Sequence, residues 1–150
     1  MNKVMIRFTA LGAGLIAATL SNVFLFGQVM ADSISISPTS LVVPLGGQQA
    51  VLTVRAEGSA QSVIQIRAFR WKPSRPPSEY YKQNQVVVSP AISRLNARQE
   101  LTVRLVRVDS APVQEKECYR VLVDRLPDNL ENAKSITLRI RHSVPLCFTD

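Results

Sequence analysis

The chain has 150 residues and a formal net charge of +7, from 18 basic and 11 acidic side chains. That length suits one domain or two very small ones. It contains one histidine, without evident partners for a catalytic triad or a zinc site, and two cysteines, which are too few for a disulfide framework. A glycine-rich phosphate loop is also absent from the sequence. We therefore expect a binding protein rather than an enzyme, with no cofactor and no metal.

The first 31 residues have the three parts of a secretory signal. Lys3 and Arg7 give a positive start, residues 10–20 are an apolar run, and residues 29–31 (VMA) place small side chains at positions −3 and −1. The uncharged stretch is also long enough to cross a bilayer, so a retained anchor is the alternative. Polar side chains within it favour cleavage. The sequence predicts a signal peptide at residues 1–31, export from the cytoplasm, and no membrane span in the mature chain.

The mature part, residues 32–150, stays basic, because removal of Lys3 and Arg7 lowers the formal net charge only from +7 to +5. Its arginines are scattered, without a run of like charge. A basic chain suggests nucleic-acid binding, but export and the lack of a basic helix or an aromatic-basic platform argue against it. The arginines are interpreted either as contacts for partner proteins or as solvated side chains on sheet faces.

In chain order, short β-rich runs alternate with turn signals. Residues 33–43 alternate and then continue apolar, and Pro38 within them indicates an edge strand or a bulge. A glycine pair marks a turn before the second run, QAVLTVRA, at residues 49–56. The third run, SVIQIRAFRW, covers residues 62–71. The proline-rich, polar segment 73–84 is interpreted as a loop.

Four more runs follow in the second half of the chain. A valine run at residues 86–88 ends at Ser-Pro, and residues 99–108 alternate cleanly between apolar and polar side chains. Residues 118–126 form the next predicted strand, which Pro127 stops. The last run, residues 135–148, places apolar side chains at almost every second position.

Seven short strands without a convincing helical segment are typical of a two-sheet sandwich. We predict an all-β, immunoglobulin-like, seven-stranded sandwich at residues 32–150. Neither cysteine is placed for an antibody-type bridge between sheets. Cys118 and Cys147 lie at the start of one strand and the end of the next, so they either form a disulfide or remain separate thiols. Glu115 and Glu117 are expected to face solvent in a turn.

The last run carries the pattern with most information about function. Its apolar side chains lie at period two: Ile136, Leu138, Ile140, Val144, Leu146 and Phe148. Only His142 interrupts the row, and a lone histidine there is more typical of packing than of catalysis or metal binding. A run of some 14 residues is longer than the common strand of about 5–6. It is either a long strand that fills its own core, or an edge that pairs with another chain and offers it apolar side chains.

Five segments resemble, in order, parts of the N-terminal domain of the PapD-like periplasmic pilus chaperones. Residues 33–43 resemble the first strand of that family, and residues 64–71 (IQIRAFRW) resemble its third. Residues 89–95 (SPAISRL) resemble the segment before its fifth strand. Residues 119–127 (YRVLVDRLP) and 141–146 (RHSVPL) resemble motifs of the archaic, Csu-type branch. The resemblance covers essentially all of the mature chain.

The resemblance implies a periplasmic chaperone that binds pilus or fimbrial subunits by donor-strand complementation. A subunit in such a system is an incomplete sandwich that lacks its last strand, and the chaperone lends one of its own. On this basis Ile136, Leu138 and Ile140 would be the donor residues. Arg120 would anchor the C-terminal carboxylate of the subunit, and the alternative is an ordinary solvated arginine. An outer-membrane usher would be the second partner.

Two departures from the family pattern are visible in the sequence. The family's usual basic anchor positions hold Ser40 and Pro145 here. Family members also have a second immunoglobulin-like domain, and the sequence to Asp150 accounts for the first alone. We expect a fragment, a disrupted reading frame or a single-domain relative, so a truncated or non-functional chaperone is included in this interpretation. The alternative function is a stand-alone exported immunoglobulin-like domain with a binding or structural role.

Overall fold

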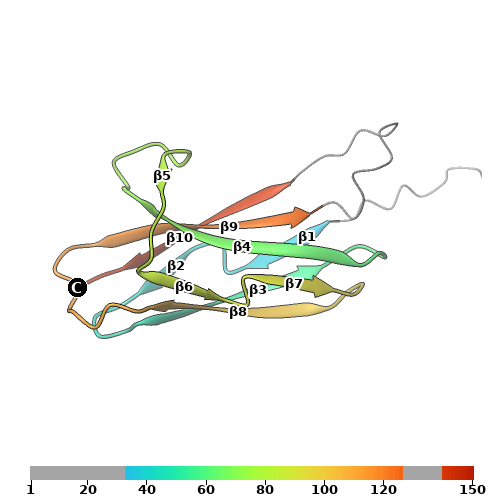
Figure 1. Ribbon diagram of the computed structural model, residues 1–150, viewed down its shortest axis with the longest axis horizontal. Helices are drawn as coiled ribbons and strands as arrows, with labels where there is room; N and C mark the ends of the chain where they lie inside the picture. Colours follow the sequence, from blue (N-terminus) through green and yellow to red (C-terminus); the bar gives the residue numbers. More distant parts are fainter. Residues whose placement is uncertain (1–32, 127–139) are drawn as a thin grey trace, which may run out of the picture.

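The computed structural model describes residues 33–126 and 140–150 (Figure 1). These residues form ten strands: β1 (Ile34–Ser37), β2 (Leu41–Val43), β3 (Gln49–Ala56), β4 (Ser62–Trp71), β5 (Tyr80–Tyr81), β6 (Val86–Ser89), β7 (Ile92–Leu95), β8 (Glu100–Arg107), β9 (Glu117–Leu126) and β10 (Arg141–Phe148). Within these two ranges, no helix is long and apolar enough to cross a membrane.

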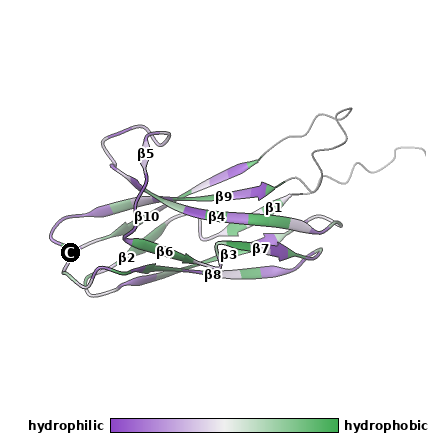
Figure 2. Cartoon of the chain, in the orientation of Figure 1, coloured by the Kyte–Doolittle hydropathy of each residue, from purple (hydrophilic) through white to green (hydrophobic). Residues whose placement is uncertain are grey.

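The strands build two sheets that face each other. One sheet has the order β1-β3-β8-β6, and the other has the order β2-β10-β9-β4, with β5 and β7 both paired to β4. The strand pairs are antiparallel except that of β2 and β10, which is parallel. Figure 2 shows apolar stretches along both sheets, whereas the connection that carries β5 is mostly hydrophilic. This architecture confirms the predicted all-β, immunoglobulin-like sandwich.

The core lies between the sheets because the strands alternate with period two. In β3, every second residue from Ala50 to Ala56 is buried, and the residues between them are exposed or half-buried. β8 contributes Val103 and Leu105 in the same way. The facing sheet supplies the other large buried side chains of this cluster: Leu41, Val43, Ile64, Ile66, Leu95, Tyr119, Val121, Val123, Val144, Leu146 and Phe148.

β9 is buried on both faces along most of its length. Tyr119 and Val121 belong to the core between the sheets. Cys118, Leu122 and Asp124 have the opposite parity and are also buried, with at most 8% of their surface exposed. The outer face of this sheet is therefore a packed surface rather than a simple row of solvated side chains.

The number of strands is ten among the described residues, and the predicted seven is wrong. Residues 33–43 form two strands, because Pro38 has no N–H for a ladder and the chain changes sheet there, with β1 on β3 and β2 on β10. Two short strands pair with β4, namely β5, inside the segment interpreted as a loop, and β7. Strands of two and four residues are too short for an alternating pattern to reveal. Of the run at 135–148, the part before residue 140 lies outside the described residues.

Candidate functional site

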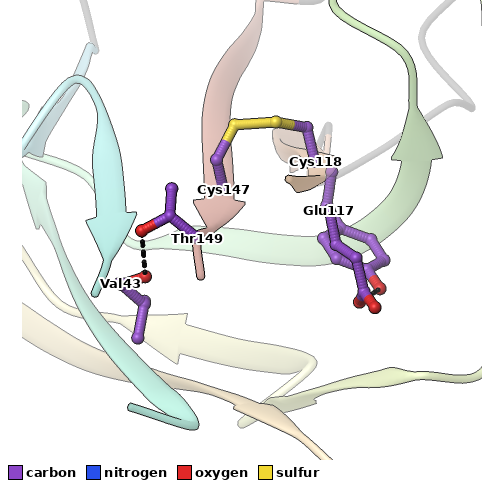
Figure 3. Close-up of a disulfide and its surroundings, with 6 residues drawn as sticks. Val43, Glu117, Cys118, Cys147 and Thr149 are labelled. Carbon is purple, nitrogen blue, oxygen red and sulfur yellow. Dashed lines mark hydrogen bonds between the residues drawn. A yellow bond between two sulfur atoms is a disulfide. The ribbon is translucent and has the colours of Figure 1, made fainter. Parts of the chain in front are cut away.

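One edge of β10 is only partly covered. Its first side pairs with β9 along the whole strand. On the other side, β2 pairs only with Leu146–Phe148, and beyond them the N–H and hydroxyl of Thr149 both donate to the carbonyl oxygen of Val43 (Figure 3). On this second side, no strand within the described ranges pairs with Arg141–Pro145. An extended segment of another chain can therefore pair with β10 at that point.

The backbone of this open edge offers both donors and acceptors. The Cα atoms of Cys118 and Cys147 are 4.2 Å apart, the spacing of a pair whose backbone groups do not bond to each other. Because ladder character alternates, Arg141, Ser143 and Pro145 have the same character, and their backbone groups point away from β9. Pro145 has no N–H. A partner strand would thus meet three acceptors and two donors.

The side chains on the inner face of β10 form an apolar row along the strand, which starts in the core and runs toward the first residue of the strand. Its buried members are Val144, Leu146 and Phe148. His142 is half-buried, and Ile140, just before the strand, has the same parity and is 49% exposed. Ile140, one of the three predicted donor residues, thus stands at the solvent end of the row. The other two, Ile136 and Leu138, lie outside the described residues.

Arg120 lies on the outer face of β9, between Phe69 of β4 and Pro145 of β10. Its guanidinium carbon is 3.9 Å from the centroid of the Trp71 ring, which is a cation–π contact. Its Nε is buried and has no hydrogen-bond partner, and burial lowers the pKa of Arg120 below its ordinary value. Among the described residues, Arg120 pairs with no carboxylate. The guanidinium can therefore bind an anionic group from outside the domain.

Cys118 and Cys147 form a disulfide between β9 and β10 (Figure 3). The two residues are direct register partners, so their side chains leave the same face of the sheet, as a bridge requires. The link lies within one sheet, unlike the antibody-type bridge between sheets. It joins β9 to β10 two residues from Arg120 and within the part of β10 that β2 covers.

A group of charges lies further along the same face, at the start of β10. Asp124 is 8% exposed and accepts hydrogen bonds from Nη2 of Arg67 and from Nε of Arg141, each at 2.6 Å. Burial acts to raise the pKa of Asp124, but the hydrogen bonds from Arg141 and Arg67 outweigh it and hold the pKa below its ordinary value. Nη1 of Arg141 also donates to the hydroxyl of Tyr80 at 3.4 Å. These contacts fix the first residue of β10 against β9, next to Ile140.

Glu117 does not face solvent, and the interpretation of the arginines as solvated is wrong for Arg107. The two form an ion pair, with Nε 3.1 Å from Oε2, and the Arg107 side chain is 3% exposed. Arg107 also donates to the carbonyl oxygens of Asp109 and Ala111. The Arg107 hydrogen bond lowers the pKa of Glu117, while burial raises the pKa of Tyr119 to about 12. The alternation of β8 indicates that Arg107 should be buried, because Arg107 continues the row of every second residue that faces the core.

The family model described as pili and flagellar-assembly chaperone, PapD N-terminal domain, matches residues 33–149. A search of curated proteins finds no significant sequence match.

Solved structures with the same fold are similar at low identity. The CsuC–CsuE chaperone–tip adhesion subunit pre-assembly complex from archaic Csu pili of Acinetobacter baumannii is 21% identical, with a TM-score of 0.65, over 78% of this chain and 56% of that chain. The complex of SafA pilin with the SafB chaperone from Salmonella enterica is 22% identical, with a TM-score of 0.62, over 79% and 55%. The periplasmic chaperone SfaE is 18% identical, with a TM-score of 0.62, over 78% and 57%. The chain thus spans little more than half the length of these proteins.

The family match covers nearly the whole described part of the chain, and the structural matches share its sandwich. The matching family is one of chaperones, not of enzymes. The chain therefore belongs to the pili and flagellar-assembly chaperone family, with a PapD-like N-terminal domain at residues 33–149.

Proposed function

We propose that this protein is a periplasmic chaperone that binds pilus subunits by donor-strand complementation along β10. The observation that carries the proposal is the open backbone edge at Arg141–Pro145, on the same strand as the apolar row of side chains that ends in exposed Ile140. Two of the similar structures contain a chaperone bound to a pilus protein, a tip adhesion subunit in one and a pilin in the other.

The chemistry of the edge suits a partner whose own sandwich is incomplete. Such a subunit has an unpaired strand edge, which is a template for aggregation, and an open apolar core, whose exposure to water is unfavourable. The backbone of β10 would pair with the edge, and Ile136, Leu138 and Ile140 would fill the open groove. Full burial of one such side chain contributes roughly 1.5–3 kcal/mol, so a few of them would stabilise the complex substantially.

Arg120 is the proposed anchor for the C-terminal carboxylate of the subunit. Ser40 and Pro145, at the family's usual basic positions, carry no positive charge, whereas Arg120 is a cation without a carboxylate partner among the described residues. A hydrogen bond between charged groups contributes roughly 1.5–3 kcal/mol. This use of Arg120 follows the resemblance to the archaic, Csu-type branch, which is part of the proposal.

The remaining parts of the proposal concern the whole protein. An outer-membrane usher would be the second partner, and export would remove residues 1–31. Mass spectrometry of the protein recovered from the periplasm should give a mature chain that begins near Asp32. A chain that still begins at Met1 would contradict the signal peptide.

The donor edge is tested by co-expression with a pilus subunit encoded in the same genome. Leu138→Thr with Ile140→Thr keeps β-propensity but removes apolar area, so we expect recovery of soluble subunit to fall several-fold. The matched control is Val51→Thr with Val87→Thr, at positions that are 47% and 49% exposed on the opposite sheet. Equal recovery with both pairs would rule out donation by these residues. A wild-type protein that retains no subunit would favour the stand-alone binding or structural domain.

A further inference from the structure

The indole of Trp71 connects Arg120 to the loop that follows β4. One face of the ring lies against the Arg120 guanidinium, at 3.9 Å. The Nε1–H at the edge of the ring donates to the carbonyl oxygens of Arg75 and Pro76, at 3.2 and 3.3 Å. The loop therefore holds the edge of the indole, and the face of the indole holds the guanidinium.

The other neighbours of Arg120 limit its movement without neutralising its charge. Its register partners are Phe69 on one side and Pro145 on the other, and the ring of Phe69 is packed against Tyr80, with 4.8 Å between centroids. The Arg120 Nε is buried and unpaired. A ring face attracts a cation but does not replace a carboxylate. The guanidinium is thus fixed in plane and still lacks an anion.

We propose that Trp71 is the positioning residue of the Arg120 anchor, and that its indole holds the guanidinium plane ready for the C-terminal carboxylate of a bound subunit. The inference rests on the proposed function, in which Arg120 binds that carboxylate. A planar guanidinium binds a carboxylate through two parallel N–H···O bonds. A stack that fixes this plane beforehand reduces the freedom that binding would otherwise remove. Trp71 should therefore act on the preference for a free carboxylate and not on strand pairing along β10.

The test uses the full chain and two forms of one peptide. The peptide reproduces the C-terminal strand of a pilus subunit encoded in the same genome, once with a free carboxylate and once as the amide. We expect the wild-type protein to bind the free acid about tenfold more tightly than the amide. Trp71 is the single tryptophan of the sequence, so intrinsic fluorescence reports on the stack. The free acid should shift its emission, and the amide should not.

Four variants separate positioning from general packing. Trp71→Leu removes the ring and should reduce the preference for the free acid from about tenfold to about twofold, whereas Trp71→Phe keeps a ring face and should retain most of it. Arg120→Ala should abolish the preference. Tyr81→Leu is the matched control, because Tyr81 is an aromatic residue of β5 that is 53% exposed and register-paired to Arg70. It should bind both peptides as the wild type does.

The outcomes distinguish the inference from the function on which it rests. If Trp71→Leu keeps the tenfold preference while Arg120→Ala abolishes it, the positioning role is wrong and the anchor stands. If Arg120→Ala keeps the preference, or the wild type has none, the anchor is wrong and the inference falls with it. If Trp71→Leu does not fold, the tryptophan fluorescence of the wild-type protein tests the positioning role. Equal emission with the free-acid and the amide peptide overturns the role of Trp71.

Discussion

The first residues of β9 point alternately to the two faces of its sheet, and the side chains on the two faces are held by different interactions. Glu117 and Tyr119 point to the inner side of the sandwich, where Glu117 accepts hydrogen bonds from Arg107 and from the Tyr119 hydroxyl. Cys118 and Arg120 point to the outer face, where a disulfide and an aromatic ring take the place of ionic partners. Residues that are neighbours in sequence are thus held by different kinds of interaction.

The difference lies in how completely each arginine is satisfied. All three guanidinium nitrogens of Arg107 have acceptors, from Glu117 and two backbone carbonyls. Arg120 has a ring beneath it and a buried Nε without an acceptor. An arginine whose nitrogens are all paired within the domain contributes to folding and has little capacity left for a partner. The comparison therefore assigns Arg107 to the stability of the fold, and it leaves Arg120 available to bind a partner.

The largest expected effect comes from the covalent link on the outer face. Cys118→Ala with Cys147→Ala should lower the free energy of unfolding by roughly 3–4 kcal/mol, because the disulfide closes a loop with a sequence separation of 29. Urea unfolding of the oxidised wild type and the double variant measures the loss. Thiol counting on unreduced, denatured protein comes first, and two free thiols per chain would contradict the disulfide.

The next effect compares the two arginines directly. Arg107→Met leaves the largely buried Glu117 without its cationic partner, so the free energy of unfolding should fall by about 3 kcal/mol. Arg120→Met leaves no carboxylate unpaired among the described residues and keeps an apolar stem beside Trp71. The free energy of unfolding should therefore fall by less than about 1 kcal/mol. Urea unfolding of both variants, with unchanged m-values, decides the matter. Equal losses would show that the two faces are not different in kind.

Sequence reasoning succeeds here where a side chain's place depends on parity alone. Alternation predicts the sandwich and places Val144, Leu146 and Phe148 in one row, which the structure buries together. The ends of the last two predicted strands likewise bring Cys118 and Cys147 within reach of each other. Each of these inferences needs only the period of a strand and the sense of its neighbour.

The parts that sequence reasoning misses depend on how strands from distant segments align. Trp71 reaches Arg120 only because β4 pairs with β9 in a register that sets Trp71 opposite Cys118, and the alternation within either strand does not contain that register. Pro38 indicates an edge or a bulge, but not that the chain changes sheet. Glu117 has the residue type of a surface loop, and its ion pair with buried Arg107 overrides that tendency.

The smallest effect is the dependence of stability on pH, which also separates the two faces. Glu117 faces Arg107, Tyr119 and Arg70, and the hydrogen bond from Arg107 is the main cause of its lowered pKa. Because the pKa is lower in the folded chain than in the unfolded chain, the unfolded chain binds more protons as the pH falls. This contribution to stability is complete above the unfolded pKa, about 4.3 for a glutamate, and is lost as the pH falls through the folded value. Arg120, with no described carboxylate beside it, adds nothing in this range.

Glu117→Gln should therefore flatten the decline of the unfolding free energy between about pH 5 and pH 2. Arg120→Met should leave the slope as it is in the wild type. Asp124, whose pKa is also lowered, keeps a residual dependence in both variants, so the slope of Glu117→Gln should decrease without reaching zero. Urea midpoints measured across this range give the three slopes. A slope in Glu117→Gln equal to that of the wild type would mean that the inner face does not hold Glu117 in its charged form.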